Sequence, residues 1–268
     1  PRPDNLAIGR GMAAAVAAAG AVPALTAVAD GAPRLGLDDA TLVDLAESGD
    51  VEKASWRDLA RLAAAGAKGG TTVAGTAALA AAAGVRVMAT GGIGGVHAGA
   101  GFDVSADLEA IARLPLIVVC AGAKSILDLA ATLERLESLN VPVLGWRTER
   151  FPAFYTIDSG LPVPSVASVD ELARLARGHW ALGGGGLVLA QVPPVPVDPA
   201  ALERWTAQAH AVAASRGITG AAVTPFVLAE LARASGGRTV AANRALVLAN
   251  AALAARVATA LAADGGDG

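Results

Sequence analysis

The stretch PLIVVCAGAKSILD, residues 115–128, decides how this chain is expected to fold. Residues 115–120 are apolar on both faces, which is typical of a central strand in a parallel sheet. The chain then leaves through small residues and reaches Lys124 where the strand ends. Apolar residues repeat with helical spacing from Ser125 onward, which predicts a helix whose positive end faces the lysine and favours its neutral amine.

Lys124 is one of only three lysines, against eighteen arginines. An arginine stays protonated, whereas a partly buried lysine can lose its proton and become an amine nucleophile. Open α/β sheets bind ligands outside the carboxyl ends of their strands, which is where Lys124 is expected. On spacing alone, a solvated lysine at a helix start explains the residue equally well. The segment GAKS is not a phosphate-binding loop, because positions 118 and 123 are not glycine.

Outward from this stretch, segments of helix and strand length alternate, which predicts an α/β fold with parallel strands and crossover helices. Expected strands are residues 22–29, 85–89, 115–120, 141–146 and a run after the glycines at 183–186. Expected helices are residues 6–19, 38–48, 57–65, 71–83, one from Ser125, and two or three after residue 201. We expect one domain over residues 1–263, an irregular, aromatic-rich segment after Trp146, and a disordered tail at 264–268.

The composition of the 268 residues, 54% hydrophobic with a net charge of −3, predicts a globular protein with a substantial core. Because no basic cluster occurs, we expect a small-molecule partner and no nucleic acid. The single cysteine, Cys120, fits a small apolar residue in a reducing cytoplasm. Residues 11–29 carry no charge, but they are mostly weakly hydrophobic alanine, so we expect no membrane span.

A glycine loop, TGGIGGVHAG at residues 90–99, follows the expected strand 85–89. Its backbone is free to wrap round a ligand and to offer N–H groups to an anion. It is not a dinucleotide fingerprint, because after Gly92 and Gly94 the pattern needs a glycine where His97 stands. His97 suits an acid, a base or a phosphate donor, and it equally suits a histidine in a surface turn.

The segment FDVSADLEA, residues 102–110, places Asp103, Ser105 and Asp107 at alternate positions before an expected helix. Such oxygen-rich spacing suits a hard divalent cation or the hydroxyls of a polyol, and it also suits a plain helix N-cap. A calcium loop of the EF-hand type is excluded, because the twelve-residue pattern does not continue to its glutamate.

Seven segments together carry a family resemblance: AGAVPAL, GTTVAGT, ATGGIGGVHAGAGFDVSADL, VVCAGAKSILDLAATLERLESLNVPVLGW, FPAFYTIDSGLPV, TPFVL and NRALVLANAALAARVA. In these segments and their order, nearly the whole chain resembles the pseudouridine-5'-phosphate glycosidase family. TGGIGGVH and AGAKSILD are the most specific of the motifs. The resemblance implies a three-layer α/β/α fold with a mainly parallel central sheet, a homotrimer, and a cytoplasmic role in nucleoside catabolism.

The resemblance also implies a reaction, the reversible cleavage of the C–C bond between ribose 5-phosphate and uracil through a lysine Schiff base with a divalent metal, usually Mn²⁺. By resemblance, Lys124 is the nucleophile and Asp103 is the metal-associated carboxylate, bonded partly through waters. Residues implied to contact substrate are Lys53, Val73 through its main chain, His97, Ser105, Ala106, Asp107 and Asn243. The residue types fit the chemistry, because lysine forms an iminium with a carbonyl-level carbon and asparagine matches the edge of uracil.

The chain departs from the family at its amino terminus, where PRPDN matches the end of an HGMPYPQN-like segment. The family's general acid is a glutamate upstream of that segment, and here no glutamate precedes Glu47. We expect either that a segment precedes residue 1 or that this version lacks the proton donor and is impaired by about 10²- to 10⁴-fold. The alternatives are a Schiff-base aldolase on another sugar phosphate, which keeps Lys124 without needing Asn243, and a non-catalytic sugar-phosphate binding protein.

Overall fold

The computed structural model describes residues 4–97, 103–218 and 223–263. Its larger sheet has five parallel strands in the order β5-β6-β9-β7-β8. The strands are β5 (Val87–Ala89), β6 (Ile117–Cys120), β7 (Val143–Trp146), β8 (Ser165–Val166) and β9 (Leu187–Ala190). This sheet confirms the predicted α/β class and the parallel pairing of its strands.

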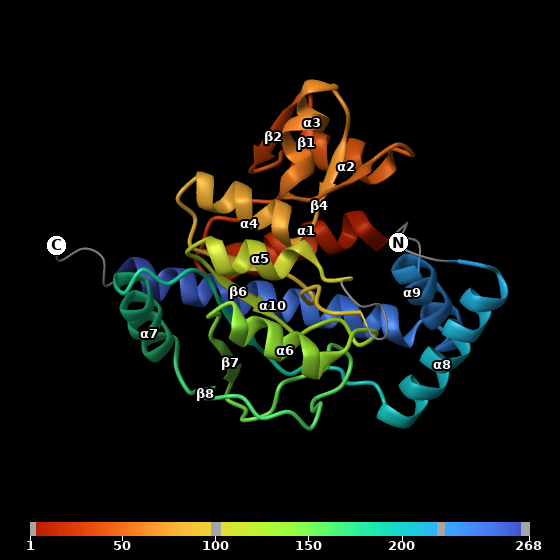
Figure 1. Cartoon of the computed structure of the whole chain (residues 1–268). Coiled ribbons are helices and arrows are strands. Elements are labelled where there is room, and N and C mark those ends of the chain that lie inside the picture. The colour runs from red at the N-terminus through yellow and green to blue at the C-terminus, as the bar shows by residue number, and fades with distance from the viewer. Residues whose placement is uncertain (1–3, 98–102, 219–222, 264–268) are drawn as a thin grey trace.

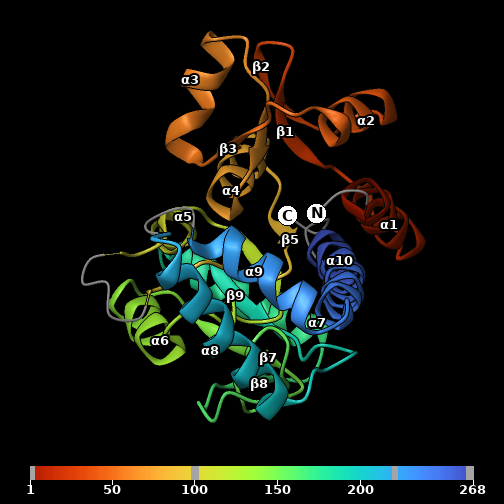
Figure 2. The same cartoon turned by 90° about the vertical axis from the view of Figure 1, so that its right-hand side faces the viewer.

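Helices cover both faces of the larger sheet, because alternate residues of its strands point to opposite sides. Val118 and Cys120 of β6 pack against α5 (Ala106–Arg113) and α6 (Leu129–Ser138). Ile117 and Val119 pack against α7 (Val169–Ala181) and α10 (Arg238–Ala263). Figure 2 shows the strands between these two pairs of helices, which confirms the three-layer arrangement. Cys120 is fully buried, and burial raises the pKa of its thiol to about 12, as expected of an apolar residue.

A second sheet forms the lobe at the top of Figure 1, with strand order β2-β1-β4-β3. Its strands are β1 (Thr26–Ala29), β2 (Ala32–Leu35), β3 (Glu52–Ala54) and β4 (Gly69–Thr71). The lobe also holds α2 (Asp39–Glu47), the 3₁₀ turn η1 (Trp56–Asp58) and α3 (Leu59–Ala64). Of these strands the sequence predicted only the first, within residues 22–29. The other three are too short and too rich in glycine and charged residues to show alternation.

The remaining helices are α1 (Asp4–Ala18), α4 (Val73–Ala82), α8 (Pro199–Ser215) and α9 (Val223–Ala234). Local capping explains where helices begin, because a side-chain oxygen accepts from an otherwise unpaired backbone N–H. Asp38 accepts from Thr41 N at 2.8 Å to begin α2, as predicted. Thr72 accepts from Gly75 N at 3.2 Å to begin α4, within two residues of the predicted start.

The prediction that a helix begins at Ser125 was wrong. The helix α6 begins at Leu129, because the side chain of Asp128 caps it by accepting from Ala131 N at 2.9 Å. Residues 124–127 form a turn, in which Leu127 N donates to Lys124 O at 3.0 Å. The positive end of α6 therefore starts beyond this turn and is capped by a carboxylate.

Helix α10 is, among the described helices, the one long and apolar enough to cross a membrane. Half of its apolar window is buried, and it packs on α1, α7, β5 and β6, as the core helix of a folded domain does. The uncharged residues 11–29 form the end of α1 and all of β1. The predicted tail at 264–268 lies outside the described residues, and a single domain over residues 1–263 stays a prediction.

Candidate active site

Lys124 stands at the carboxyl edge of β6, against the glycine loop that follows β5. The loop and the strand end are joined by three backbone hydrogen bonds, from Ala121 N to Gly91 O at 2.9 Å, Ile93 N to Gly122 O at 3.1 Å, and Lys124 N to Ile93 O at 3.2 Å. This is the edge at which open parallel sheets bind their ligands, as predicted.

The amine of Lys124 is half-buried, and burial lowers its pKa from 10.5. The negative charge of Asp107 opposes this shift, whereas the positive charge of Lys53 adds to it. Within the described ranges, Nζ of Lys124 forms no hydrogen bond or ion pair. The sequence predicted a helix N-terminus as the cause of a lowered pKa at Lys124. In the structure, desolvation and the charge of Lys53 lower it instead.

Lys68 shows what a structural lysine looks like in the same protein. Its Nζ donates to Asp44 Oδ1 at 2.7 Å and to Ser48 Oγ at 2.9 Å. The hydrogen bond to Asp44 raises the pKa of Lys68, so its ammonium is stabilised. Lys124 has the opposite shift and an unpaired amine, which suits a nucleophile.

Asp107 ties the site together through both of its carboxylate oxygens. Oδ1 accepts from Ala74 N at the start of α4, and Oδ2 accepts from Gly94 N in the glycine loop, each at 2.9 Å. The side chain of Ser105 accepts from Asp107 N at 3.2 Å, which confirms the N-cap interpretation for this segment. Asp107 is 5% exposed, so its carboxylate holds the site together and places a negative charge near Lys124. No local pattern in the sequence indicates this role, because the partners lie 33 and 13 residues away.

Gly94 has no room for a side chain beside this carboxylate. A Cβ at this position would lie 2.5 Å from Ser105 Cβ and 2.7 Å from Asp107 Oδ2. We predict that Gly94→Ala displaces the loop, lowers the thermal unfolding midpoint and reduces turnover by about 10²-fold or more. Gly178→Ala is the matched control, because its Cβ would meet nothing within 4 Å on α7. An unchanged midpoint and unchanged turnover in Gly94→Ala would contradict the prediction.

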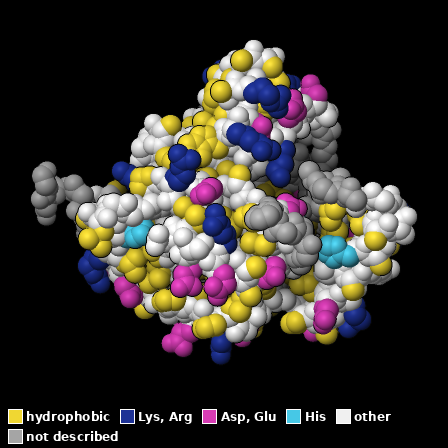
Figure 3. All heavy atoms as spheres, viewed as in Figure 1, with side chains coloured by type: hydrophobic (Ala, Val, Ile, Leu, Met, Phe, Trp, Pro, Cys, Tyr) yellow, Lys and Arg dark blue, Asp and Glu magenta, His cyan; other side chains and the backbone are white. Residues whose placement is uncertain are grey.

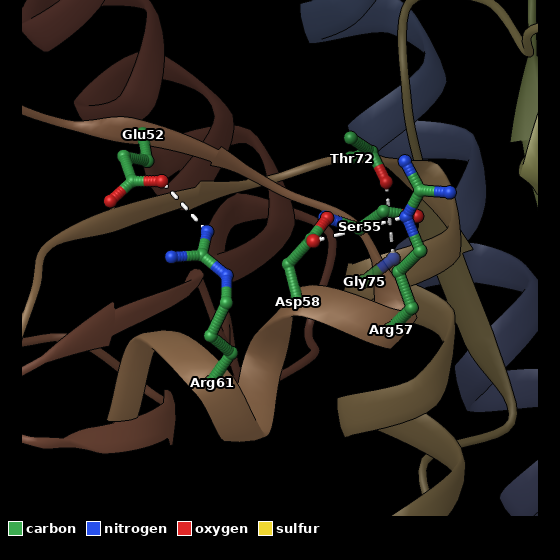
Figure 4. A network of polar contacts seen from close by, with 7 residues as sticks. All are labelled: Glu52, Ser55, Arg57, Asp58, Arg61, Thr72 and Gly75. Carbon is green, nitrogen blue, oxygen red and sulfur yellow. Dashed lines mark hydrogen bonds and ion pairs between the residues drawn. The ribbon is translucent and has the colours of Figure 1, made fainter. Parts of the chain in front are cut away.

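Lys53 and Val73 approach the site from the lobe. Lys53 lies in β3, where it pairs with Gly70 of β4, and its side chain is exposed. Val73 is the first residue of α4, so its backbone N–H has no partner within the helix. Figure 4 shows the capped start of α4, where Gly75 N donates to the Thr72 side chain, and the start of η1, where Ser55 N donates to Asp58.

In Figure 3 the lobe carries Lys and Arg side chains with Asp and Glu side chains beside them, and several Asp and Glu side chains lie over α6.

The far end of the glycine loop brings His97 and Asp103 together, as His97 N donates to Asp103 O at 3.0 Å. His97 is half-buried and Asp103 is exposed. In the part of the chain that the structure describes, no group of three or more His, Cys, Asp or Glu residues could hold a metal ion.

The start of the glycine loop lies against α10. The Asn243 side chain reaches Gly91, where its Oδ1 would be 3.3 Å from an added Cβ. Two turns further along α10, buried Asn250 donates from Nδ2 to Thr90 O at 2.8 Å and accepts from Gln191 Nε2 at 3.1 Å. Sequence reasoning missed Asn250 and Gln191. The available signal was a lone asparagine inside the apolar run LVLANAAL.

A cavity of about 770 Å³ lies between the lobe, α1 and α10. Thr72, Val73, Thr90 and Gly91 belong to its walls, so it adjoins the site, but Lys124 does not line it. Its remaining lining is mostly apolar. The chemistry-bearing side chains thus lie beside this cavity and not within it.

The effect of Lys53 on Lys124 is measurable without substrate. We predict that Lys53→Met raises the pKa of Lys124 toward 10.5, because a repelling positive charge is removed. At pH 8 the neutral fraction of Lys124 then falls, and its rate of acetylation by acetic anhydride falls with it. Competitive labelling across pH, read by mass spectrometry, gives the midpoint. Lys68→Met is the control, since Lys68 is not among the charges acting on Lys124. An unchanged or lower labelling midpoint for Lys124 in Lys53→Met would contradict the prediction.

Comparisons with known proteins agree with the resemblance seen in the motifs. Residues 1–260 match the model of the family described as Indigoidine synthase A like protein. A pseudouridine-5'-phosphate glycosidase of Roseiflexus sp. is 51% identical over 98% of this chain and 86% of its own length. One from Salinispora tropica is also 51% identical, over 98% of this chain and 83% of its own length.

Solved structures share the fold over the same extent. The prealnumycin C-glycosynthase AlnA, solved with ribulose 5-phosphate, matches with a TM-score of 0.92 and 38% identity, covering 98% of this chain and 88% of that one. An indigoidine synthase A-like protein from Thermotoga maritima matches with a TM-score of 0.87 and 31% identity, covering 96% and 87%. The chain therefore belongs to the indigoidine synthase A-like family and, within it, to the pseudouridine-5'-phosphate glycosidase enzymes.

Proposed function

We propose that this chain reversibly cleaves pseudouridine 5'-phosphate to uracil and ribose 5-phosphate, with Lys124 forming a Schiff base. The observation that carries the proposal is half-buried Lys124 at the carboxyl edge of β6, whose amine has no partner among the described residues and whose pKa is lowered by burial. The relatives named pseudouridine-5'-phosphate glycosidase and the sugar-phosphate complex of AlnA support the substrate class.

The chemistry follows from what a neutral amine can do at an anomeric carbon. The nitrogen bonds to C1' as the ring C–O bond breaks, and a proton passes from the nitrogen to the ring oxygen, which restores the nitrogen lone pair. The nitrogen lone pair then forms a C=N bond as the C1'–C5 bond to uracil breaks, and C5 takes a proton. Water adds to the iminium, releases ribose 5-phosphate and restores the amine. The buried negative charge of Asp107 stabilises the positive iminium, because opposite charges interact strongly away from bulk water.

The positions of the other predicted residues are consistent with contacts to the substrate. Lys53 and the N–H of Val73, which has no partner within α4, suit the phosphate, since both can donate to its oxygens. His97 and Asn243 stand at the two ends of the glycine loop. Ser105 and Ala106 begin α5, where the Asp107 carboxylate is already bonded to two backbone N–H groups. These two bonds fix the Asp107 carboxylate, and we propose its substrate contact beside them.

We further propose a divalent cation, Mn²⁺ or a similar ion, beside Asp103, where it would help to bind the phosphate. The exposed carboxylate supports a largely hydrated ion. Titration of Mn²⁺ followed by the loss of its free electron paramagnetic resonance signal tests the site. Equal binding by the parent and by Asp103→Ala would rule it out.

We also propose a cytoplasmic homotrimer. Light scattering on the eluting protein would give three times the chain mass of 26.3 kDa if the trimer forms. A mass of one or two chains would exclude it.

The proposed reaction is tested by two measurements on the purified chain. Uracil and ribose 5-phosphate should appear in equal amounts from pseudouridine 5'-phosphate, followed by chromatography. Borohydride with ribose 5-phosphate should leave a reduced adduct on the peptide that contains Lys124. An adduct without uracil release would instead favour a Schiff-base aldolase, and binding without an adduct would favour a non-catalytic sugar-phosphate binding protein.

A further inference from the structure

Ser125 carries a buried hydroxyl that the proposed mechanism does not use. Within the described residues, its Oγ is buried and has no hydrogen-bond partner. A buried polar atom without a partner destabilises the protein, so such atoms are rare and need an explanation. Neighbouring serines are satisfied: Ser105 Oγ accepts from Asp107 N at 3.2 Å, and Ser159 Oγ donates to Phe151 O at 2.7 Å.

The backbone holds Ser125 in place at the catalytic edge. The residue follows Lys124 in the turn closed by Leu127 N and Lys124 O, and both ends of the turn are tied to the glycine loop. Ala123 pairs with Ile93 in that loop, and Asp128 N donates to Val96 O at 2.9 Å. The unpaired hydroxyl is therefore not a feature of a loose surface segment.

A second buried atom without a partner, Nε2 of His179, lies elsewhere. It belongs to the last turn of α7 and packs beneath Gly184, just before β9 begins. That is the amino edge of the parallel sheet, whereas Ser125 lies at the carboxyl edge. Among the residues that the structure describes, Ser125 alone combines an unpaired buried hydroxyl with a place next to Lys124.

We propose that the Ser125 hydroxyl binds the substrate, by hydrogen-bonding an oxygen of the sugar phosphate that reacts at Lys124. This inference rests on the proposed function and adds a binding residue to it. The ligand class is a phosphorylated sugar. Its phosphate oxygens can accept a hydrogen bond from a serine hydroxyl, and its own hydroxyls can either accept from the serine or donate to it. Because the hydroxyl is unpaired in the protein without ligand, it is available to hydrogen-bond the ligand. The unpaired hydroxyl makes the protein without ligand less stable.

The test compares Ser125→Ala with Ser138→Ala, whose hydroxyl donates to Arg135 O at 2.8 Å on the exposed end of α6. In Ser125→Ala we expect an unfolding midpoint without ligand equal to or above that of the parent, since an unpaired polar atom is removed. We expect kcat/KM for pseudouridine 5'-phosphate and affinity for ribose 5-phosphate, measured by calorimetry, to fall about 10- to 100-fold. Ser125→Thr, which keeps a hydroxyl, should recover part of both losses, and Ser138→Ala should match the parent.

The proposal is overturned if Ser125→Ala binds ribose 5-phosphate and turns over like the parent, or if it is less stable without ligand and otherwise unchanged. The calorimetry needs no catalysis, so the role of Ser125 is decided even if the parent releases no uracil. A parent that forms no adduct but loses affinity on Ser125→Ala refutes the proposed function alone. A parent that does not bind ribose 5-phosphate at all refutes both.

Discussion

Lys124→Arg lowers kcat/KM for uracil release by at least about 10⁴-fold and prevents the borohydride-trapped adduct, because the nucleophile itself is lost. Arginine preserves a positive charge of similar reach, but its guanidinium does not deprotonate at working pH and cannot form the iminium. Burial of Lys124 makes the loss of activity more complete. It lowers the pKa of an amine and so favours a neutral nucleophile, whereas a guanidinium stays protonated in the same place. The measurements are steady-state uracil release and the intact mass after trapping.

The same substitution at Lys68 is the control. Lys68 is held by Asp44 and Ser48, and an arginine can keep such an ion pair, so Lys68→Arg should retain turnover within about 2-fold. Circular dichroism and the unfolding midpoint establish that Lys124→Arg folds, and Lys124→Met, which introduces no larger charged group, provides a second inactive variant. A trapped adduct on either Lys124 variant would show that another amine is the nucleophile.

Asp107→Asn should both destabilise the protein and impair catalysis. The carboxylate accepts from Ala74 N and Gly94 N, whereas an asparagine has one acceptor oxygen and must turn its NH₂ group toward a second N–H donor. Losing one charge-assisted bond and leaving a buried donor unpaired should reduce the free energy of unfolding by about 2–5 kcal/mol. With the glycine loop released and the negative charge near Lys124 removed, turnover should fall about 10²-fold or more.

The unfolding free energy from urea denaturation and the kcat of the surviving folded fraction check this prediction separately. Asp39→Asn is the matched control, because Asp39 is an exposed partner of Arg10 and its loss should leave both quantities nearly unchanged. The pKa of Lys124 should also fall further in Asp107→Asn, since Asp107 is the charge that raises it. A variant with parental stability and turnover would show that neither hydrogen bond matters.

The sequence by itself determined the features whose signals lie within a few residues. The apolar run of β6 and the small residues after it predicted the strand edge and the place of Lys124. The helix starts at Asp38 and Ser105 were recognisable in the same way, because a capping side chain bonds backbone only two or three residues ahead. Similarity of motifs then supplied the family and the candidate residues.

Only the tertiary structure decided what depends on distant partners. The three short strands of the lobe are defined by their pairing and not by their own pattern, as in the three-residue match of β3 to β4. The bond from Asn250 to Thr90 spans 160 residues, and the two bonds of Asp107 join three separate segments. The pKa of Lys124 is set by burial and by charges from other elements, whereas the sequence predicted a helix end as its cause. Desolvation and long-range hydrogen bonds arise when distant segments pack together. They therefore produce no periodic pattern in the local sequence.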